Sequence, residues 1–353
     1  MIRLSKKIVA RTLTATGLLT ACFSLMGGGG VHALNMCAEE PYSTTDGWQV
    51  VFFTTVGSCR FTLPEGANQI QILVVGGGGA GGWSDIDSAA GGGGGGVAIG
   101  DDVAMSGDLT ISVGAGGAGH QDRPATAAAN GTDSSLISDQ GLIVSYGGAH
   151  GSGYGESAAS SGGSGSGAHG TWTVAGSGLG GTTTFSAGVT LYGSDGGASN
   201  SDDAGGGGGG ASGPGGSGVN QDGGDGGEGL PFLDSVYGAG GGGCGVNSNG
   251  SGGTHAGGCV DNSPGEDGLD GSGAGGGGSY NAAGGSGGSG IVALLYKVES
   301  ATTTTATTSS TTPTQESSVL AVTGQTSDRG ARVAIMIFMI GCALTTIGRR
   351  RYS

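Results

Sequence analysis

The sequence has few of the residues that fill a conventional hydrophobic core. Aromatic residues make up 5% of the chain and charged residues 11%. Proline is scarce, with 7 residues, and although 77 of the 89 glycines lie within residues 76–290, they follow no sustained Gly-X-Y repeat. A collagen triple helix needs both that repeat and abundant proline, so collagen is excluded. A domain built from residues 76–290 has few large side chains to bury.

Basic residues are nearly absent from the middle of the chain. Arg60, Arg123 and Lys297 are the only ones within residues 34–323, against 26 acidic residues, which gives this part a formal charge of −23. Nucleic-acid binding uses Lys and Arg to replace phosphate counterions. A nucleic-acid partner is therefore excluded.

Motifs that carry catalysis or bind cofactors are also missing. The GxGxxG matches at residues 76–81 and 114–119 run into more glycine, whereas a nucleotide site needs a helix at that point. Residues 223–230 (GGDGGEGL) are an imperfect single copy of a calcium-binding repeat, and the other acidic pairs are typical of a solvated surface. The histidines are scattered, and no catalytic nucleophile or paired carboxylates accompany them. We predict no enzyme activity, no cofactor and no metal site.

The first 33 residues have the pattern of a secretory signal peptide. Arg3, Lys6 and Lys7 precede an apolar stretch, residues 13–26, and the small-residue segment that ends at Ala33 suits signal peptidase. We expect cleavage after Ala33. An alternative is that residues 19–22 (LTAC) act as a lipobox, which would place a lipid on Cys22.

Residues 320–353 resemble a sortase sorting signal of the LAxTG form, which is associated with class E sortases of high-GC Gram-positive bacteria. The pentapeptide is followed by a polar spacer, the apolar residues 333–347 and the arginines at 349–351; its residues are Leu320, Ala321, Val322, Thr323 and Gly324. The resemblance implies that sortase cleaves between Thr323 and Gly324 and joins Thr323 to peptidoglycan. A single-pass tail anchor is the alternative, and it leaves the pentapeptide unexplained. The positive-inside rule keeps the arginines on the cytoplasmic side in either case.

Four cysteines remain once the two terminal signals are removed: Cys37, Cys59, Cys244 and Cys259. An even number suits disulfides in an oxidising compartment. Three pairings are possible, and sequence proximity favours Cys37–Cys59 and Cys244–Cys259. A metal site is the alternative for these cysteines, but the sequence has no CxxC.

Between the signals the composition changes twice, which predicts an N-terminal lead (residues 34–47), a glycine-rich domain (48–296) and a Ser/Thr-rich stalk (297–319). β-Branched and aromatic runs bounded by turn residues predict strands within the lead and the domain. These runs are residues 47–55, 58–66, 68–76, 97–100, 108–114, 141–148, 189–193 and 288–298.

Two segments carry a resemblance to a known family. FTLPEGANQIQILVVGGGGAGG, at residues 61–82, and the closing segment of residues 273–296 resemble the start and end of the glycine-rich domain of bacterial surface proteins and phage tail adhesins. The resemblance covers residues 48–296. It implies layered bundles of polyproline-II-type helices.

Glycine loses more conformational freedom on folding than any other residue, so a folded glycine block must gain close backbone approach in return. We therefore expect a mainly β and irregular fold, with short strands framing a bundle of polyglycine, polyproline-II-type helices whose main chains pair laterally. Single apolar helices are expected near each terminus of the precursor. The alternative is a flexible glycine-serine linker without a fold.

These expectations combine into a secreted surface protein anchored to the cell wall of a Gram-positive bacterium. Its glycine-rich domain would be an adhesion module for a surface glycan or protein, because aromatic residues among Gly, Ser and Asn make good contact residues. Candidate contacts are Trp83, Tyr146, Tyr154, Trp172, Tyr192, Tyr237 and Tyr280. A structural or protective envelope protein without a dedicated ligand is the alternative function.

Overall fold

Short β-strands and glycine tracts make up the part of the chain that the computed structural model describes, which is residues 35–85, 88–119, 128–153, 159–170, 174–185, 187–200 and 203–299. All of these residues belong to the first of two compact units of the chain, Met1–Thr302. None of the residues so described is helical.

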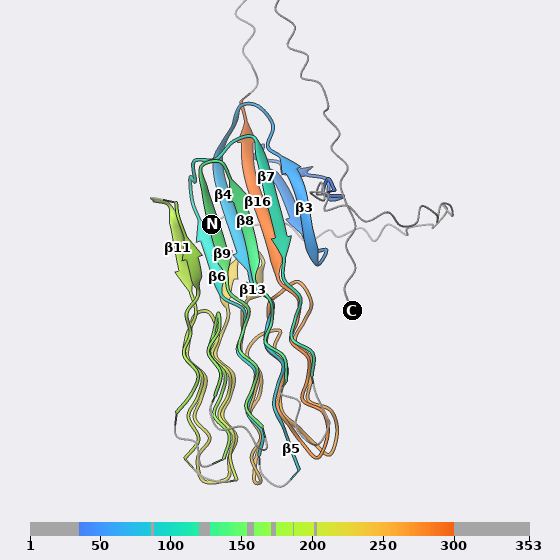
Figure 1. Ribbon diagram of the computed structural model, residues 1–353, viewed down its shortest axis with the longest axis vertical. Helices are drawn as coiled ribbons and strands as arrows, with labels where there is room; N and C mark the ends of the chain where they lie inside the picture. Colours follow the sequence, from blue (N-terminus) through green and yellow to red (C-terminus); the bar gives the residue numbers. More distant parts are fainter. Residues whose placement is uncertain are drawn as a thin grey trace, which may run out of the picture. The chain divides into compact units, whose positions relative to one another are not determined.

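Most strands form two antiparallel sheets that face each other (Figure 1). The six-stranded sheet has the order β1 (Tyr42–Ser43), β2 (Gln49–Phe53), β16 (Ile291–Val298), β4 (Ala67–Val75), β6 (Val97–Gly100) and β11 (Val189–Tyr192). The five-stranded sheet has the order β10 (Gly181–Thr183), β9 (Gly141–Ser145), β8 (Ser134–Ser138), β7 (Asp108–Val113) and β3 (Gly57–Thr62). Two smaller sheets consist of β12 (Leu230–Phe232) with β13 (Ser235–Tyr237), and of β14 (Val260–Asp261), β15 (Ser279–Tyr280) and β5 (Trp83–Ser84).

The central strands β16 and β4 of the six-stranded sheet are buried on both faces. In β4, Ile72 and Val74 enter the hydrophobic core between the two large sheets, where they join Ile111 of β7. Their neighbours Leu73 and Val75 point the other way, into a second apolar cluster. A strand that is buried on both faces needs a continuous apolar run, which explains why QILVV and IVALLY do not alternate with polar residues.

The N-terminal lead covers the free edge of β3. Arg60 N–H donates to Asn35 O (2.9 Å) and Cys37 N–H donates to Arg60 O (2.9 Å), which adds one more extended segment beside the strand. The disulfide between Cys37 and Cys59 ties the lead to this edge, as the sequence predicted. An edge strand with paired main-chain groups is protected from pairing with another chain.

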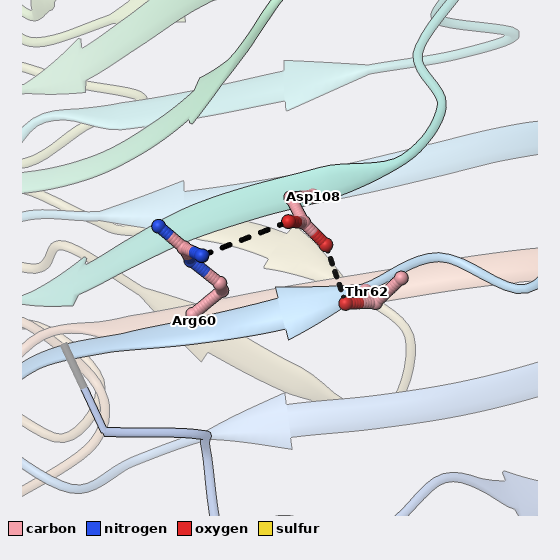
Figure 2. Close-up of polar contacts among 3 residues, drawn as sticks. All are labelled: Arg60, Thr62 and Asp108. Carbon is pink, nitrogen blue, oxygen red and sulfur yellow. Dashed lines mark hydrogen bonds and ion pairs between the residues drawn. The ribbon is translucent and has the colours of Figure 1, made fainter. Parts of the chain in front are cut away.

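On its other side, β3 is joined to β7 by side chains as well as by the strand ladder. Thr62 Oγ1 donates to Asp108 Oδ1 (2.6 Å), and an Arg60 guanidinium nitrogen lies 3.8 Å from Asp108 Oδ2 (Figure 2). Both charged side chains are about half exposed, at 50% and 58%. Solvent screens such a pair, so it contributes at most about 1 kcal/mol.

The glycine tracts continue from the strands and run side by side as extended segments (Figure 1). In residues 91–96, successive N–H groups donate to three different neighbours and return to the same neighbour every third residue. Gly91 and Gly94 donate to residues 206 and 209, and Gly93 and Gly96 to residues 149 and 146; Gly92 and Gly95 donate to residues 276 and 273. The buried main chain is satisfied by other tracts, as buried N–H and C=O groups require.

These tracts pack too closely for side chains. A Cβ built on Gly78 would lie 2.0 Å from the carbonyl oxygen of Ala274, and one built on Gly91 would lie 2.0 Å from that of Gly241. No real Cβ comes closer than 3.0 Å to such an atom. Glycine is therefore required by main-chain contact at these positions.

Acidic side chains accept hydrogen bonds from main-chain N–H groups that are not bonded to a neighbouring tract. Each of these carboxylates accepts a hydrogen bond from the N–H of a different segment, at 2.6–3.0 Å: Asp133 from Gly147, Asp195 from Gly178, Asp225 from Ser251, Asp267 from Ser286 and Asp270 from Ser289. Part of the acidic composition therefore completes the hydrogen bonding of the tracts. From the sequence we interpreted the acidic pairs as solvated surface residues, and that interpretation did not include a role in hydrogen bonding to the tracts.

The predicted fold class is wrong. The strands are not a frame around a helix bundle: they form two sheets with their own hydrophobic core, and the glycine tracts are extended segments with no helix among the described residues. The mistake was to judge the core from average composition, whereas the apolar residues are concentrated in a few strands. Lateral main-chain pairing, which the same reasoning predicted, is present.

The predicted terminal apolar helices, at residues 13–26 and 333–347, lie outside the described residues. Within the described part, no helix has the length and hydropathy needed to cross a bilayer. Three other predictions also lie outside the described residues: the cleavage site at Ala33, the stalk beyond residue 299 and the sorting residues 320–324.

Candidate functional site

Several glycine tracts end together at the three-stranded sheet β14–β15–β5, remote from the large sheets (Figure 1). The tract of residues 76–82 leads into β5, and that of residues 274–278 leads into β15. Ser279 N–H donates to Gly82 O (3.1 Å) and Val260 N–H donates to Gly278 O (3.3 Å), so the hydrogen bonding between segments continues into the sheet. The strands are parallel because the segments that deliver them run in the same direction.

Two asparagines end this small sheet in a left-handed conformation. Asn262 has φ 54° and Asn281 has φ 63°, a region that Asn tolerates better than most residues. Their N–H groups donate to Tyr280 O (2.8 Å) and Ser84 O (2.7 Å), and Asn281 Nδ2 donates to Asn262 Oδ1 (3.0 Å). The turns that follow β14 and β15 are thereby held in place.

A pocket of about 190 Å³ opens beside these turns. We call it the Tyr280 pocket; its lining includes Ser88, Cys244, Val246, Asp261, Asn262 and Tyr280. Asp261 and Asn262 are exposed at its mouth, and the ring of Tyr280 is half-buried. The lining thus combines an aromatic ring, a carboxylate, an amide and a hydroxyl, which is the mixture typical of small-molecule sites.

Ser88 is the most unusual member of the lining. The residue is 3% exposed, and its hydroxyl has no hydrogen-bond partner among the described residues. A buried hydroxyl without a partner costs about 1–3 kcal/mol, so natural proteins usually provide one. The hydroxyl oxygen itself has almost no solvent-accessible surface, so Ser88 lines the pocket through its other atoms.

The second disulfide forms one wall of the pocket. Cys244 and Cys259 are bonded to each other, as predicted, and pack with Ala89 in a small buried cluster. Cys244 N–H donates to Ala89 O (2.8 Å), which fixes the disulfide to the segment that carries Ser88. Asp261 lies close enough to both sulfurs to complete a metal site with them, but sulfurs bonded to each other are not thiolate ligands.

The predicted contact aromatics do not form one surface. Tyr280 lines the pocket, and Trp83 is half-buried in the neighbouring strand. Trp83 pairs with Ser279, so it lies on the opposite face of the small sheet from Tyr280. Of the candidates, Tyr280 alone is both described and in the pocket lining.

The remaining described candidates lie near the large sheets. Tyr192 ends β11 and packs against the second apolar cluster, and Tyr146 follows β9 and is half-buried. Tyr237 belongs to that cluster with 6% exposure, and burial raises its pKa above the usual value. The side chain of Tyr237 is therefore part of the core, and its contact with a ligand stays a prediction. Tyr154 and Trp172 lie outside the described residues.

Sequence reasoning missed most of the pocket. Asp261 and Asn262 lie two and three residues after Cys259, so the predicted disulfide could have placed them near Cys244. Ser88 has no comparable signal, because a serine among alanines and glycines is typical of the whole block. Its position depends on which tracts become neighbours.

The fold and the pocket define a class of protein in which a β-sandwich is extended by packed glycine tracts that carry a small polar site. The family model of the glycine-rich domain matches residues 54–297, and the chain belongs to this family. The match ends within one residue of the predicted domain end at 296, and begins six residues after the predicted start at 48. A search of the curated proteins found no match.

Proposed function

We propose that this protein is a secreted surface protein, attached to the peptidoglycan of a Gram-positive bacterium, whose glycine-rich domain is a binding module. Secretion rests on the signal-like residues 1–33, and attachment rests on the sorting residues 320–324. The two disulfides support an oxidising compartment. Membership of the glycine-rich domain family, and the resemblance to phage tail adhesins in particular, supports binding as the role.

One observation carries the binding proposal: the Tyr280 pocket lies at the opposite end of the domain from residue 299, where the stalk begins. β16 pairs antiparallel with β4, so that Ile291 lies beside Val75 and Val298 beside Ala67. Glu299 therefore leaves at the end of β4 that is remote from the tracts, and its N–H donates to Gly66 O (3.2 Å). A site at the far end of a tethered domain is the most accessible place for a partner outside the cell.

The distance between the two ends follows from chain length. Residues 67–82 link the stalk end to β5 in an extended path, and extended chain spans at most about 3.3–3.6 Å per residue. This gives roughly 50 Å between the point of attachment and the pocket. The pocket can be presented beyond the attachment point without any rearrangement of the domain.

Attachment is tested by replacing both residues of the sorting bond, Thr323→Ala with Gly324→Ala, in a Gram-positive host that has a class E sortase. We expect the wild type to be released only by muralytic digestion, with a peptidoglycan fragment on Thr323 detectable by mass spectrometry. The variant should appear in the membrane fraction or the medium. Equal wall retention of both proteins would contradict the anchoring proposal.

Binding is tested separately by comparing attachment of cells that display wild-type protein with cells that display Tyr280→Ala. A matched control is Tyr42→Ala, which removes an exposed tyrosine from β1. We expect reduced attachment to glycan-coated surfaces for Tyr280→Ala alone. If all three strains attach equally, the alternative of a protective envelope protein without a dedicated ligand is favoured.

A further inference from the structure

The Tyr280 pocket has the chemistry of a site for one neutral sugar ring. We propose that it binds a single pyranose unit of a surface glycan, an inference that rests on the proposed binding function and names its ligand class.

Charge excludes anionic ligands. Asp261 is a carboxylate at the mouth of the pocket, and the only basic residues that the structure describes, Arg60 and Lys297, belong to the large sheets. Among the residues that the structure describes, no cation lies beside Asp261 to compensate the charge of an anion. Phosphate, sulfate and sialic acid are therefore poor candidates.

Size excludes extended ligands. The volume of about 190 Å³ is below the roughly 300 Å³ at which pockets for drug-sized molecules begin, and it corresponds to about six water molecules. One six-membered ring with its hydroxyl groups is of this order. Longer glycans would place one residue in the pocket and leave the rest outside.

The polar groups suit hydroxyl recognition in particular. Asp261 is exposed, and its carboxylate can only accept hydrogen bonds. Asn262 uses its carbonyl oxygen to accept from Asn281, which leaves its NH₂ group as a donor. A sugar hydroxyl both donates and accepts, so neighbouring hydroxyls on one ring can satisfy the carboxylate of Asp261 and the amide of Asn262 together.

Tyr280 provides the complementary apolar surface. The face of an aromatic ring carries partial negative charge, and the axial C–H groups of a pyranose form a weakly positive face. The ring of Tyr280 is held by β15, whose main chain pairs with β5 and β14. A ring fixed in this way loses little conformational entropy on binding.

The test uses purified full-length protein and saturation-transfer NMR with four probes: methyl glucoside, methyl galactoside, N-acetylglucosamine and, as an anionic comparison, N-acetylneuraminic acid. We expect transfer to the ring C–H protons of at least one neutral sugar, with a Kd in the millimolar range, and none to the anionic sugar. No transfer to any neutral sugar, or equal transfer to the anionic one, would overturn the proposal.

Variants locate the binding site. Tyr280→Ala and Asp261→Ala should each weaken binding about tenfold, which corresponds to about 1.4 kcal/mol, while Tyr280→Phe keeps the ring and should change affinity less than threefold. Tyr42→Ala is the control and should leave affinity unchanged, and thermal unfolding of each variant shows whether it is folded. If Tyr280→Ala is unfolded, Tyr280→Phe and Asp261→Ala still decide the question. Unchanged affinity in Asp261→Ala would place the sugar elsewhere.

The sugar-binding test can fail independently of the tests of wall anchoring and cell attachment. Wall anchoring and cell attachment can be confirmed while no monosaccharide binds, in which case the ligand assignment alone fails. Sugar binding by protein that is never wall-attached would refute the anchoring proposal and keep the site.

Discussion

Replacing Gly78 by alanine tests whether main-chain contact is what requires glycine in the tracts. Gly78 N–H donates to Gly288 O (2.9 Å), and its carbonyl accepts from Gly117 N–H (2.9 Å). A methyl group at Gly78 would lie 2.0 Å from Ala274 O, an atom that already accepts a hydrogen bond from Gly288. Neighbouring segments must therefore move apart by about 1 Å to reach the 3.0 Å that a real Cβ keeps.

The cost can be estimated in two parts. Overpacking a closely packed interior costs about 1–3 kcal/mol. Each buried hydrogen bond that is broken by the movement costs about 1–3 kcal/mol more. We expect Gly78→Ala to lower the free energy of unfolding by about 3–6 kcal/mol, a large share of the 5–15 kcal/mol that is typical of folded proteins.

Gly213 provides a matched control with the opposite expected sign. A Cβ at this position meets only Glu228 N, at 3.9 Å, and the backbone is outside the left-handed region. Alanine restricts the unfolded chain more than glycine does, so Gly213→Ala should stabilise the protein by about 0.4–1 kcal/mol. Composition and charge change identically in the two variants.

The assay is urea unfolding of each variant, followed by tryptophan fluorescence. Trp48 precedes β2 and packs against the second apolar cluster, and Trp83 lies in the small sheet, so the signal reports both ends of the domain. The reasoning is refuted if Gly78→Ala lies within 1 kcal/mol of wild type. It is also refuted if Gly213→Ala is as destabilising as Gly78→Ala, because a general preference for glycine would then explain both.

Three further predictions concern the disulfide, a buried tyrosine and a carboxylate. Replacing Cys244 and Cys259 together by alanine opens a loop of 15 residues and should cost about 3 kcal/mol, measured by thermal unfolding; unchanged stability would contradict this. Burial raises the pKa of Tyr296 in the folded protein. The stabilisation that neutral Tyr296 gives is therefore complete below its unfolded-state pKa near 10, and it is lost as pH rises through the folded-state pKa. The urea midpoint should therefore fall less between pH 9 and pH 11 in Tyr296→Phe than in wild type, and equal losses would count against the idea. Asp225 accepts from both N–H and Oγ of Ser251, so Asp225→Ala should cost about 1 kcal/mol and Asp225→Asn, which keeps an oxygen acceptor, clearly less.

Eight of the eleven strands of the two large sheets were predicted, because each is a short apolar run bounded by turn residues, whereas β1, β8, β10 and the strands of the small sheets were missed. Residues 68–76 and 288–298 were predicted as strands; β4 begins one residue before the first range and ends within it, and β16 lies within the second. Their pairing with each other was not predictable, because more than 200 residues separate them. The continuous apolar runs could have indicated burial on both faces, and hence a sandwich, but the low average content of apolar residues hid them.

The disulfides were predictable from proximity, and the pocket beside one of them was not. Cys244 and Cys259 are 15 residues apart, so pairing them needs no knowledge of the fold. Ser88 and Tyr280, in contrast, meet only because tracts from opposite ends of the domain become neighbours. With almost no side chains in the tracts, nothing in the sequence records which tract lies beside which.

The same absence of side chains limits where this domain can recognise anything. Within a tract, N–H and C=O groups are used by neighbouring tracts, and a Cβ has no room at positions such as Gly78 and Gly91. The tract interior therefore offers a partner neither shape nor free hydrogen-bonding groups. Larger side chains are concentrated where the tracts end, in the large sheets and in the small sheet around Tyr280. The large sheets bury most of theirs in the core, although Tyr42, Val56 and Ile137 stay exposed, and the Tyr280 pocket lies at the small sheet.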